Sequence, residues 1–505
     1  MSIIEEHSEE CSTSPLEWFD VPPTQTAVEK SYFSEYQPLT SLHDGSTIDF
    51  YIPASTDDYV DLQSTRLYLK CQLTQTNGTD VPNDQFPAPV NDLFNSLWSN
   101  VELILNERLI SHSNGMHGYI SMISHLIHDS EESLQSERSM RLMFKDTPGQ
   151  MDVTEPRRAN HEHLIPGHDI RRTVADDNAV TYATIPADEV VGNQGLYQRN
   201  LVTAGSHFFE LMGPLRIDLF EQERYLPNGI SMKLRFHRQK PSFALMAEGN
   251  GFKVKVSEAY LYVRKVHPSP GVLLGHTQAL NKMPAKFPIT RKECKEIAIA
   301  SGLRSVKKDN IFLGQLPKRV VIAMVDGDAA AGSYAKNPYN FKHYNVNHMQ
   351  LHADGEPVRA QPLKPNMATA DYIHCYETLY RGLNNLDGEK GCIIKRVDWN
   401  KGYSLFAFDL TPDMDADDHY ALIRHGNLRL EVEFADALPR PINILVYAEF
   451  DNVLEITADR HIQFDYVQTS NHSDSNFGWA DAFSWSLSNG SSTTTSTGSL
   501  CYKHG

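Results

Sequence analysis

The sequence has few of the features that mark secreted, membrane-spanning or disulfide-stabilised proteins. Its six cysteines are scattered along 505 residues, and none forms a C-x-x-C pair. No apolar run approaches the roughly 18 residues that a membrane-spanning helix needs. The first 20 residues are polar and acidic, without the basic and apolar regions of a secretory signal. We therefore expect no transmembrane segment, reduced thiols, and synthesis in the cytoplasm.

An excess of positive charge is also missing. The chain carries 46 Lys and Arg residues against 64 Asp and Glu residues, which gives a formal net charge of −18. Proteins that bind the phosphate backbone of nucleic acids need clustered basic side chains. The composition therefore predicts no direct, sequence-specific binding to nucleic acid.

Three polar stretches approach metal-binding motifs without completing them. The segment Asp413–Arg424 spaces its acids as a calcium loop does, but Asp418 stands where that loop requires glycine, and an arginine stands where it requires glutamate. The HEH stretch at 161–163 lacks the i, i+4 histidine spacing of H-E-x-x-H. His125 and His128 are three residues apart on an expected helix, but no further ligand is in view. We predict no metal ligands.

Catalytic signatures are absent as well. DGDAAAGS at 326–333 is followed by no G-K-[ST], and the chain has no G-x-S-x-G nucleophile elbow. We predict no catalytic residues, no cofactor-binding residues and no cofactor, in a protein that is not an enzyme. The alternative is a β-sandwich that binds or hydrolyses carbohydrate, with Trp18, Trp98 and Trp399 as sugar platforms. Packing in a core or an interface is the simpler explanation of these tryptophans.

What the sequence does contain is alternation of apolar and polar residues, which is typical of half-buried β-strands. In Arg424–Phe450, the residues Leu428, Leu430, Val432 and Phe434 take one parity, and charged residues take the other. After two prolines, a second strand is expected with Ile442, Ile444, Val446 and Ala448 facing inward and the other parity facing water. Similar strands are predicted around 47–53, 66–73, 100–110, 213–219, 229–236, 253–266, 318–327 and 403–410, and short helices are predicted near 116–128 and 370–383.

The same order of elements occurs twice. NVELILNERLI precedes the first helix as NVNHMQLHADGEPV precedes the second, and GISMKLRF corresponds to GNLRLEVEF. Early elements of the two halves are separated by more residues than late ones, so the first half carries a long insertion. The pattern predicts an all-β protein of two consecutive eight-stranded antiparallel jelly-roll sandwiches (a double jelly roll), each with a short helix. Pattern alone leaves other Greek-key sandwiches open.

This interpretation divides the chain into five parts. We expect a polar N-terminal arm at 1–30, a first jelly roll at 31–267 with a long inserted loop at about 130–210, a linker at 268–285, a second jelly roll at 286–466, and a flexible Ser/Thr/Gly-rich tail at 467–505.

Several separated stretches resemble the major capsid proteins of Polinton/Maverick elements and adintoviruses. They include LEWFDVPPTQTAVEKSYFSEYQPL near the start, DDYVDL at 57–62, FLGQLPKRVVIAMVDGDAAAGSYAKNP at 312–338, NPYNFKHYNVNHMQLHADGEPV at 337–358, and Arg424–Phe450. The resemblance covers roughly residues 15 to 466. The tail after Val467 departs from it.

The resemblance implies a hexon-like structural subunit of a virion. Such proteins form homotrimers whose six jelly rolls make pseudo-hexagonal capsomers, and these tile an icosahedral capsid around double-stranded DNA. It also implies contacts with neighbouring capsomers and with penton and minor capsid proteins, and assembly in the nucleus. The arm at 1–30 is then expected to dock on such partners, and the loops at 130–210 and 326–345 to form towers or trimer contacts.

Overall fold

The structure is a computed structural model. It describes residues 21, 23–42, 47–82, 85–154, 163–164, 170–174, 180–184, 192–386, 392–414 and 419–464. The chain separates into two units, Met1–Asp465 and Tyr466–Gly505, and every described residue belongs to the first. The tail at 467–505 and most of the arm at 1–30 therefore lie outside the described residues, although the first strand already begins at Val28.

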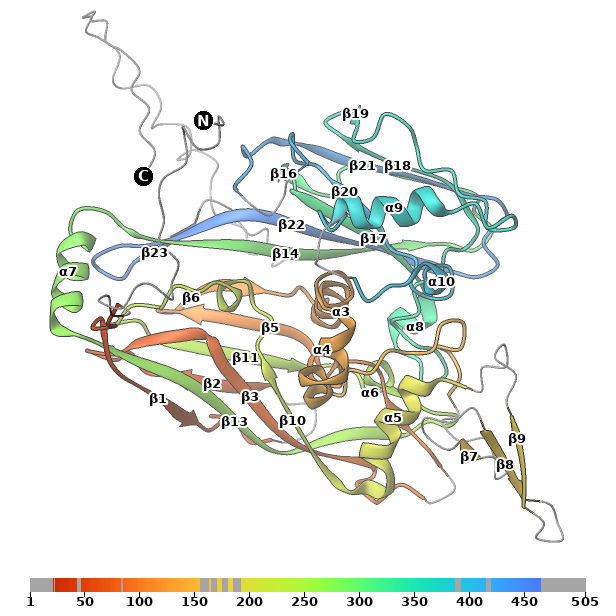
Figure 1. Ribbon diagram of the computed structural model, residues 1–505, viewed down its shortest axis with the longest axis horizontal. Helices are drawn as coiled ribbons and strands as arrows, with labels where there is room; N and C mark the ends of the chain where they lie inside the picture. Colours follow the sequence, from red (N-terminus) through yellow and green to blue (C-terminus); the bar gives the residue numbers. More distant parts are fainter. Residues whose placement is uncertain are drawn as a thin grey trace, which may run out of the picture. The chain divides into compact units, whose positions relative to one another are not determined.

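The first half of the chain forms two facing four-stranded antiparallel sheets (Figure 1). One has the order β1 (Val28–Tyr36), β13 (Phe252–Pro268), β3 (Tyr59–Gln75), β10 (Phe208–Pro214). The other has the order β2 (Ile48–Ile52), β11 (Met232–Arg238), β5 (Trp98–Leu105), β6 (Arg108–His112). When these strands are counted 1 to 8 along the chain, the sheets have the orders 1-8-3-6 and 2-7-4-5. This is jelly-roll topology.

The second half repeats this topology strand for strand. Its 1-8-3-6 sheet consists of β14 (Ala285–Ile299), β22 (Ile442–Ile456), β17 (Arg319–Asp326) and β20 (Phe406–Asp409). Its 2-7-4-5 sheet consists of β15 (Ser305–Lys308), β21 (His425–Phe434), β18 (Val346–Ala353) and β19 (Glu356–Pro357). Two short strands are added: β16 (Leu313–Gln315) pairs with β21, and β23 (Ile462–Phe464) pairs with β22. The predicted fold class, a double jelly roll, is confirmed.

Both predicted helices are present and occupy the same place in the two topologies. Helix α3 (His117–His128) follows the fifth strand of the first roll, and α9 (Ile373–Gly382) follows the fifth strand of the second. The connection that holds α3 runs over 113–207, whereas the one that holds α9 runs over 358–405, which locates the expected insertion. Smaller elements complete the described chain: α2 (Leu93–Ser96), α4 (Glu131–Gln135), α5 (Gln194–Thr203), α6 (Pro241–Ala244), α7 (Pro270–Leu280), α8 (Gly327–Ala331), α10 (Arg396–Trp399), the 3-10 turns η2 (Glu137–Arg141), η3 (Ala204–Ser206) and η4 (Asp218–Glu221), and the strands β4 (Ala88–Pro89), β7 (His163–Leu164), β8 (Ile170–Val174), β9 (Val180–Thr184) and β12 (Leu245–Met246).

The two hairpins that precede these helices turn at the predicted positions. Asn106 and Glu107 have φ values of 45° and 66° between β5 and β6, and Asp354 and Gly355 have φ values of 52° and 86° between β18 and β19. Two consecutive residues with positive φ make the turn whose twist matches that of the flanking strands. Asn, Asp and Gly tolerate this conformation best, which explains why both turns were recognisable from sequence.

Other expectations were wrong in detail. The strand expected at 213–219 lies earlier, because Pro214 has no N–H to extend the ladder and η4 begins at Asp218. The 130–210 segment is not loop throughout: it contains α4, η2, α5 and the three-stranded sheet β7-β8-β9. The stretch between the two rolls carries α7, whose side chains are all at least partly exposed.

The segment Arg424–Phe450 shows where sequence alternation is and is not sufficient. In β21, Leu428, Leu430, Val432 and Phe434 are buried while the charged residues between them are partly or fully exposed, as predicted. In β22, however, Leu445 and Tyr447 are also buried, so the expectation of a solvent-facing side was wrong there. The other side of this sheet is covered by α3 and η4 of the first roll, which contact β14, and by α9, which contacts β20.

Candidate functional site: the junction between the jelly rolls

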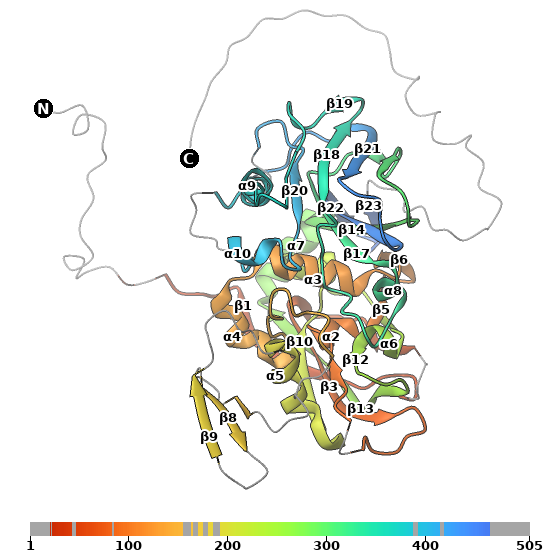
Figure 2. The ribbon, with the colours of Figure 1, turned by 90° about the vertical axis from the view of Figure 1, so that its right-hand side faces the viewer.

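Helix α3 lies between the two jelly rolls (Figures 1 and 2). It contacts β5 of the first roll and β14 of the second. Every residue from His117 to Ile127 is buried, including Tyr119, Ile123 and Leu126. A helix that is buried on all sides belongs to a core rather than to a surface.

Each core also takes side chains from the other roll. The apolar cluster of the second roll includes Ile123 and Leu126 of α3. The cluster of the first roll includes Phe287 of β14 and Leu454 of β22. Burial of one such side chain stabilises a fold by about 1.5–3 kcal/mol. The two sandwiches therefore stabilise each other and form one compact unit.

A buried polar network begins at the end of α3. His125 Nδ1 lies 2.7 Å from Asp129 Oδ2, and Arg141 Nη1 lies 3.0 Å from His125 Nε2. Burial, together with the charges of the neighbouring arginines, holds the pKa of His125 well below its usual value, so its ring is neutral. Burial alone would raise the pKa of Asp129, but the hydrogen bond from His125 and the charge of Arg138 lower it to about 2.

Lys292 on β14 connects this network to the second roll. Its Nζ lies 2.5 Å from Glu221 Oε2 and 3.2 Å from Ser124 Oγ, both in the first roll. Arg216 binds the other oxygen of Glu221 at 3.2 Å. One carboxylate thus receives a cation from each roll, which ties the two sandwiches through charge-assisted hydrogen bonds.

A second ion pair lies on the covered side of β22. Arg319 Nη1 lies 2.9 Å from Glu449 Oε2, and both side chains are almost fully buried. His128 of α3 approaches Glu449 Oε1 at 3.2 Å, and Tyr447 donates a hydrogen bond to the same oxygen at 2.7 Å. Burial would raise the pKa of Glu449, but Arg319 and His128 hold it well below its usual value.

A further set of contacts joins the insertion of the first roll to the 326–345 loop. Arg199 Nη2 lies 2.6 Å from Asp146 Oδ1 with both side chains fully buried, and Asn337 donates to the other Asp146 oxygen at 2.9 Å. Tyr339 Oη lies 2.6 Å from Ser96 Oγ. The middle of this loop is therefore packed inside the junction rather than projecting from it.

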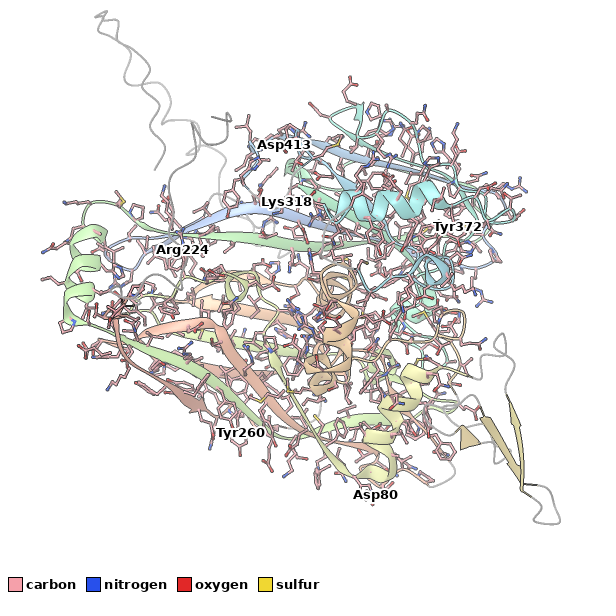
Figure 3. The ribbon with its side chains drawn as sticks, in the orientation of Figure 1. Asp80, Arg224, Tyr260, Lys318, Tyr372 and Asp413 are labelled. Atoms are coloured by element: carbon pink, nitrogen blue, oxygen red, sulfur yellow. The ribbon has the colours of Figure 1, made fainter. Side chains whose placement is uncertain are left out.

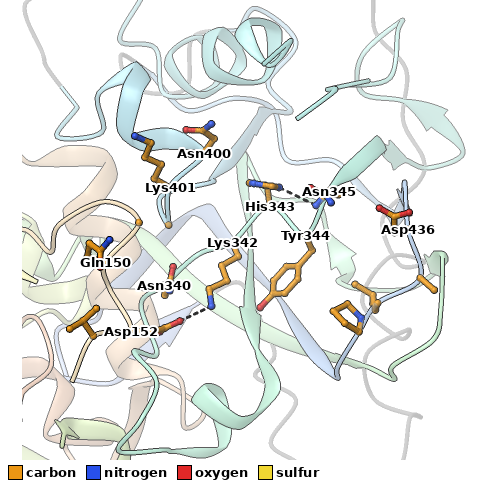
Figure 4. Close-up of a pocket in the computed structure, with 16 residues that line it drawn as sticks. Gln150, Asp152, Asn340, Lys342, His343, Tyr344, Asn345, Asn400, Lys401 and Asp436 are labelled. Atoms are coloured by element: carbon orange, nitrogen blue, oxygen red, sulfur yellow. Dashed lines mark hydrogen bonds and ion pairs between the residues drawn. The ribbon is translucent and has the colours of Figure 1, made fainter. Parts of the chain in front are cut away.

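A cleft opens at the loop end of the junction (Figure 4). It has a volume of about 760 Å³ and is lined by 149, 150, 152 and 153 of the first roll and by 340, 342–345, 400–402 and 436–439 of the second. Lys342 and Asp152 form an ion pair across it at 2.6 Å. His343 Nδ1 accepts the backbone N–H of Asn345 at 3.0 Å, so that ring nitrogen is already occupied. The cleft has the volume of a small-molecule pocket but no nucleophile paired with a free base.

The charged side chains at the centre of the junction are paired and buried. His125, Asp129, Arg319 and Glu449 are each engaged by one another or by a neighbour, and all four are shielded from solvent. General acid–base chemistry requires such groups to reach a substrate. The geometry instead gives a rigid, charge-neutralised contact between two sandwiches.

The residues considered from sequence are dispersed. Trp98 and Trp399 are buried, at 1% and 0% exposure, and pack in the cores, which is the simpler of the two explanations considered from sequence. Buried side chains cannot serve as sugar platforms. His125 and His128 bind different partners, Asp129 and Glu449. Trp18, most of the HEH stretch and the middle of 413–424 lie outside the described residues.

Within the described ranges, no three His, Cys, Asp or Glu side chains gather in a way that would hold a metal ion. In the same ranges, none of the helices has the length and apolar character required to span a bilayer. The described cysteines, Cys71, Cys294, Cys375 and Cys392, are free thiols.

Comparison with known proteins agrees with the topology: this chain has the fold of the double jelly-roll major capsid proteins of viruses. A chain of the Sputnik virophage structure aligns with a TM-score of 0.60 and 13% identity, over 94% of this chain and 97% of that chain. The faustovirus major capsid protein aligns with a TM-score of 0.53 and 9% identity, over 90% and 94%. In sequence, the chain is 21% identical over 465 residues to the uncharacterized protein F54H12.2 of Caenorhabditis elegans, covering 88% of this chain and 100% of that protein. No family model matches the chain.

Asp218 offers a test of the junction by pH. Its Oδ1 accepts a hydrogen bond from the backbone N–H of Lys292 at 3.3 Å. Burial raises the pKa of Asp218 to about 7, although the positive charge of Lys292 acts to lower it. The folded state therefore holds a proton that the unfolded chain releases near pH 4, so this group favours folding at low pH and loses that contribution as pH rises to 7. We expect Asp218→Asn to raise the melting temperature at pH 8 relative to the parent, with a smaller gain at pH 5. Equal changes at both pH values would show that Asp218 titrates normally.

Proposed function

We propose that this protein is a major capsid protein of the Polinton/Maverick and adintovirus type, a structural subunit and not an enzyme. The observation that carries the proposal is the pair of jelly rolls with identical strand order, locked together by a junction buried from solvent. A shell subunit must keep two sandwiches in fixed orientation so that its contacts with neighbours repeat. The likeness in fold to the faustovirus major capsid protein supports the same function.

In this proposal, residues 31–267 and 286–466 are the two jelly rolls and 268–285 is the linker between them. Three copies form a homotrimer with six jelly rolls, and these pseudo-hexagonal capsomers tile an icosahedral capsid around double-stranded DNA. Penton and minor capsid proteins complete the shell, and the acidic arm at 1–30 docks on such partners. The subunit is made in the cytoplasm, assembled in the nucleus, and located in the virion capsid, without sequence-specific contacts to DNA.

The direct test is the mass and shape of the purified full chain. We expect native mass spectrometry to give a trimer of 57.1-kDa chains, about 171 kDa in total. Negative-stain images should show hexagonal outlines. Addition of oligosaccharides should not change the mass. A stable monomer that binds or cleaves a glycan would contradict the proposal and favour the carbohydrate-active alternative.

A further inference from the structure

The two jelly rolls differ in how the outer face of the 1-8-3-6 sheet is covered. In the second roll, this face lies under α3 and η4 of the first roll and under α9, and Leu445, Tyr447 and Glu449 are buried on it. In the first roll, outward-facing residues of β13, such as Tyr260 and Tyr262, remain partly exposed. Figure 3 shows Tyr260 at the outer edge of the first roll, directed away from the rest of the described chain.

Each roll has an ion pair between its third and eighth strands, and the exposure of the two pairs measures this difference. Lys70 on β3 and Glu258 on β13 are 2.9 Å apart, with side chains 32% and 41% exposed. Arg319 on β17 and Glu449 on β22, the third and eighth strands of the second roll, are 2.9 Å apart and 0% and 2% exposed. An ion pair between the third and eighth strands is thus desolvated in the second roll and open in the first.

The open face has the composition of a protein interface. Phe33 on β1 and Phe208 on β10 are 58% and 57% exposed, and Tyr68 and Tyr260 lie ring against ring at 5.9 Å between them. Aromatic residues are enriched in interfaces and depleted on free surfaces. The face is also pre-ordered, because Tyr68 donates to Glu210 at 2.8 Å and the ammonium of Lys70 sits over the Phe208 ring. Side chains that are already fixed lose less entropy on binding.

The segments of the second roll that correspond to α3 and η4 carry exposed apolar side chains. Whereas α3 has only His128 exposed, α9 exposes Ile373 at 47%. The connection between the sixth and seventh strands, which holds η4 in the first roll, exposes Leu422 at 84% and Ile423 at 46% in the second. The first roll uses these two connections to cover the second roll. In the second roll, α9 packs on β20 of its own sheet, yet Ile373 at its start and the pair Leu422 and Ile423 remain exposed.

We propose that the outer face of the β1-β13-β3-β10 sheet is the docking surface for a second copy of this chain, which covers it with the α9 region and residues 419–424 of its second roll. This inference rests on the proposed capsid function and specifies its subunit contact. The contact is head-to-tail, because one surface binds a different surface of the next copy. Such contacts repeat until the ring closes. Three copies then place six jelly rolls in one ring, in which each 1-8-3-6 sheet is covered by the preceding roll.

The test compares substitutions on this face with matched substitutions elsewhere, in the full chain. Phe33→Asp and Tyr260→Asp, and Leu422→Asp on the opposing surface, should each weaken self-association at least tenfold by analytical ultracentrifugation. The controls are Tyr51→Asp, 45% exposed on the other sheet of the first roll, and Leu274→Asp, 60% exposed on α7. Both controls should associate as the parent does. Melting curves verify that each variant remains folded.

A photo-crosslinker at position 260, in a mixture of isotopically light and heavy chains, identifies the occupant. Light-to-heavy crosslinks to 373–382 or 419–424 support the inference. If the parent is a trimer but the face variants remain trimeric, or if the crosslinks join position 260 to residues 1–27 of the same copy, this surface assignment is overturned while the capsid proposal stands. A parent chain that stays monomeric at every concentration overturns both.

Discussion

Replacing Arg319 by Met should lower the free energy of unfolding by about 3–5 kcal/mol, because it leaves Glu449 as a buried charge without its main partner. Arg319 also donates from Nε to the carbonyl of Gly382 at 2.8 Å, so the substitution releases the C-terminal end of α9 as well. Glu449 then keeps His128 and Tyr447 as hydrogen-bond partners. Chemical denaturation followed by circular dichroism measures the change.

The chain supplies its own control for this prediction. Lys70→Met removes the cation of an ion pair between the corresponding strands of the first roll, where both side chains are partly exposed. Exposed ion pairs contribute about 0–1 kcal/mol, so this variant should unfold almost as the parent does. Equal losses in the two variants would show that burial of the second-roll face does not govern the energetics. The double variant Arg319→Met, Glu449→Leu should recover most of the lost stability, because no charge is then left unpaired.

The fold could be predicted from sequence because its strands are local patterns. Every second residue of β3 from Leu67 to Leu73 is apolar and buried. The residue types at Asn106 and Asp354 predict the two turns. The helices were visible as apolar stripes. These features depend on neighbours one to four residues apart, which is the range over which sequence periodicity carries information.

The junction could not be predicted in the same way, because its partners are far apart in the chain. Lys292 meets Glu221, and His128 meets Glu449, through contacts that only the packing of two domains creates. One signal was present: Glu449 and Arg319 are charged residues within or beside strongly apolar strands, and such residues are rarely buried without a partner. The buried pair of Asp146 and Arg199 carries no such signal, because both residues lie within the insertion expected to be loop.

The covered face of β22 explains the main error. Alternation indicates that one side of a strand is apolar, but it does not indicate whether the polar side meets water or another domain. Leu445 and Tyr447 interrupt the alternation of β22, and that interruption is the local trace of burial on both sides. By the same criterion, the aromatic residues on the outer side of β13 and β3 resemble a surface that is covered in the assembled protein.

Ile123→Ala in α3 should reduce the free energy of unfolding by about 2–5 kcal/mol, since the lost side chain leaves a cavity where α3 packs into the second roll. Ile123 is fully buried, and its cluster includes Tyr447 and Leu445 of β22. The matched control is Ile373→Ala at the start of α9, where the side chain is 47% exposed and the change should stay within about 0.5 kcal/mol.

Calorimetry adds a second measurement. Because each core takes side chains from the other roll, the parent should unfold in one transition, and weakening α3 should begin to separate it into two. A parent that already shows two independent transitions would mean that the rolls are separate domains joined by a linker, and the junction would then be incidental to stability.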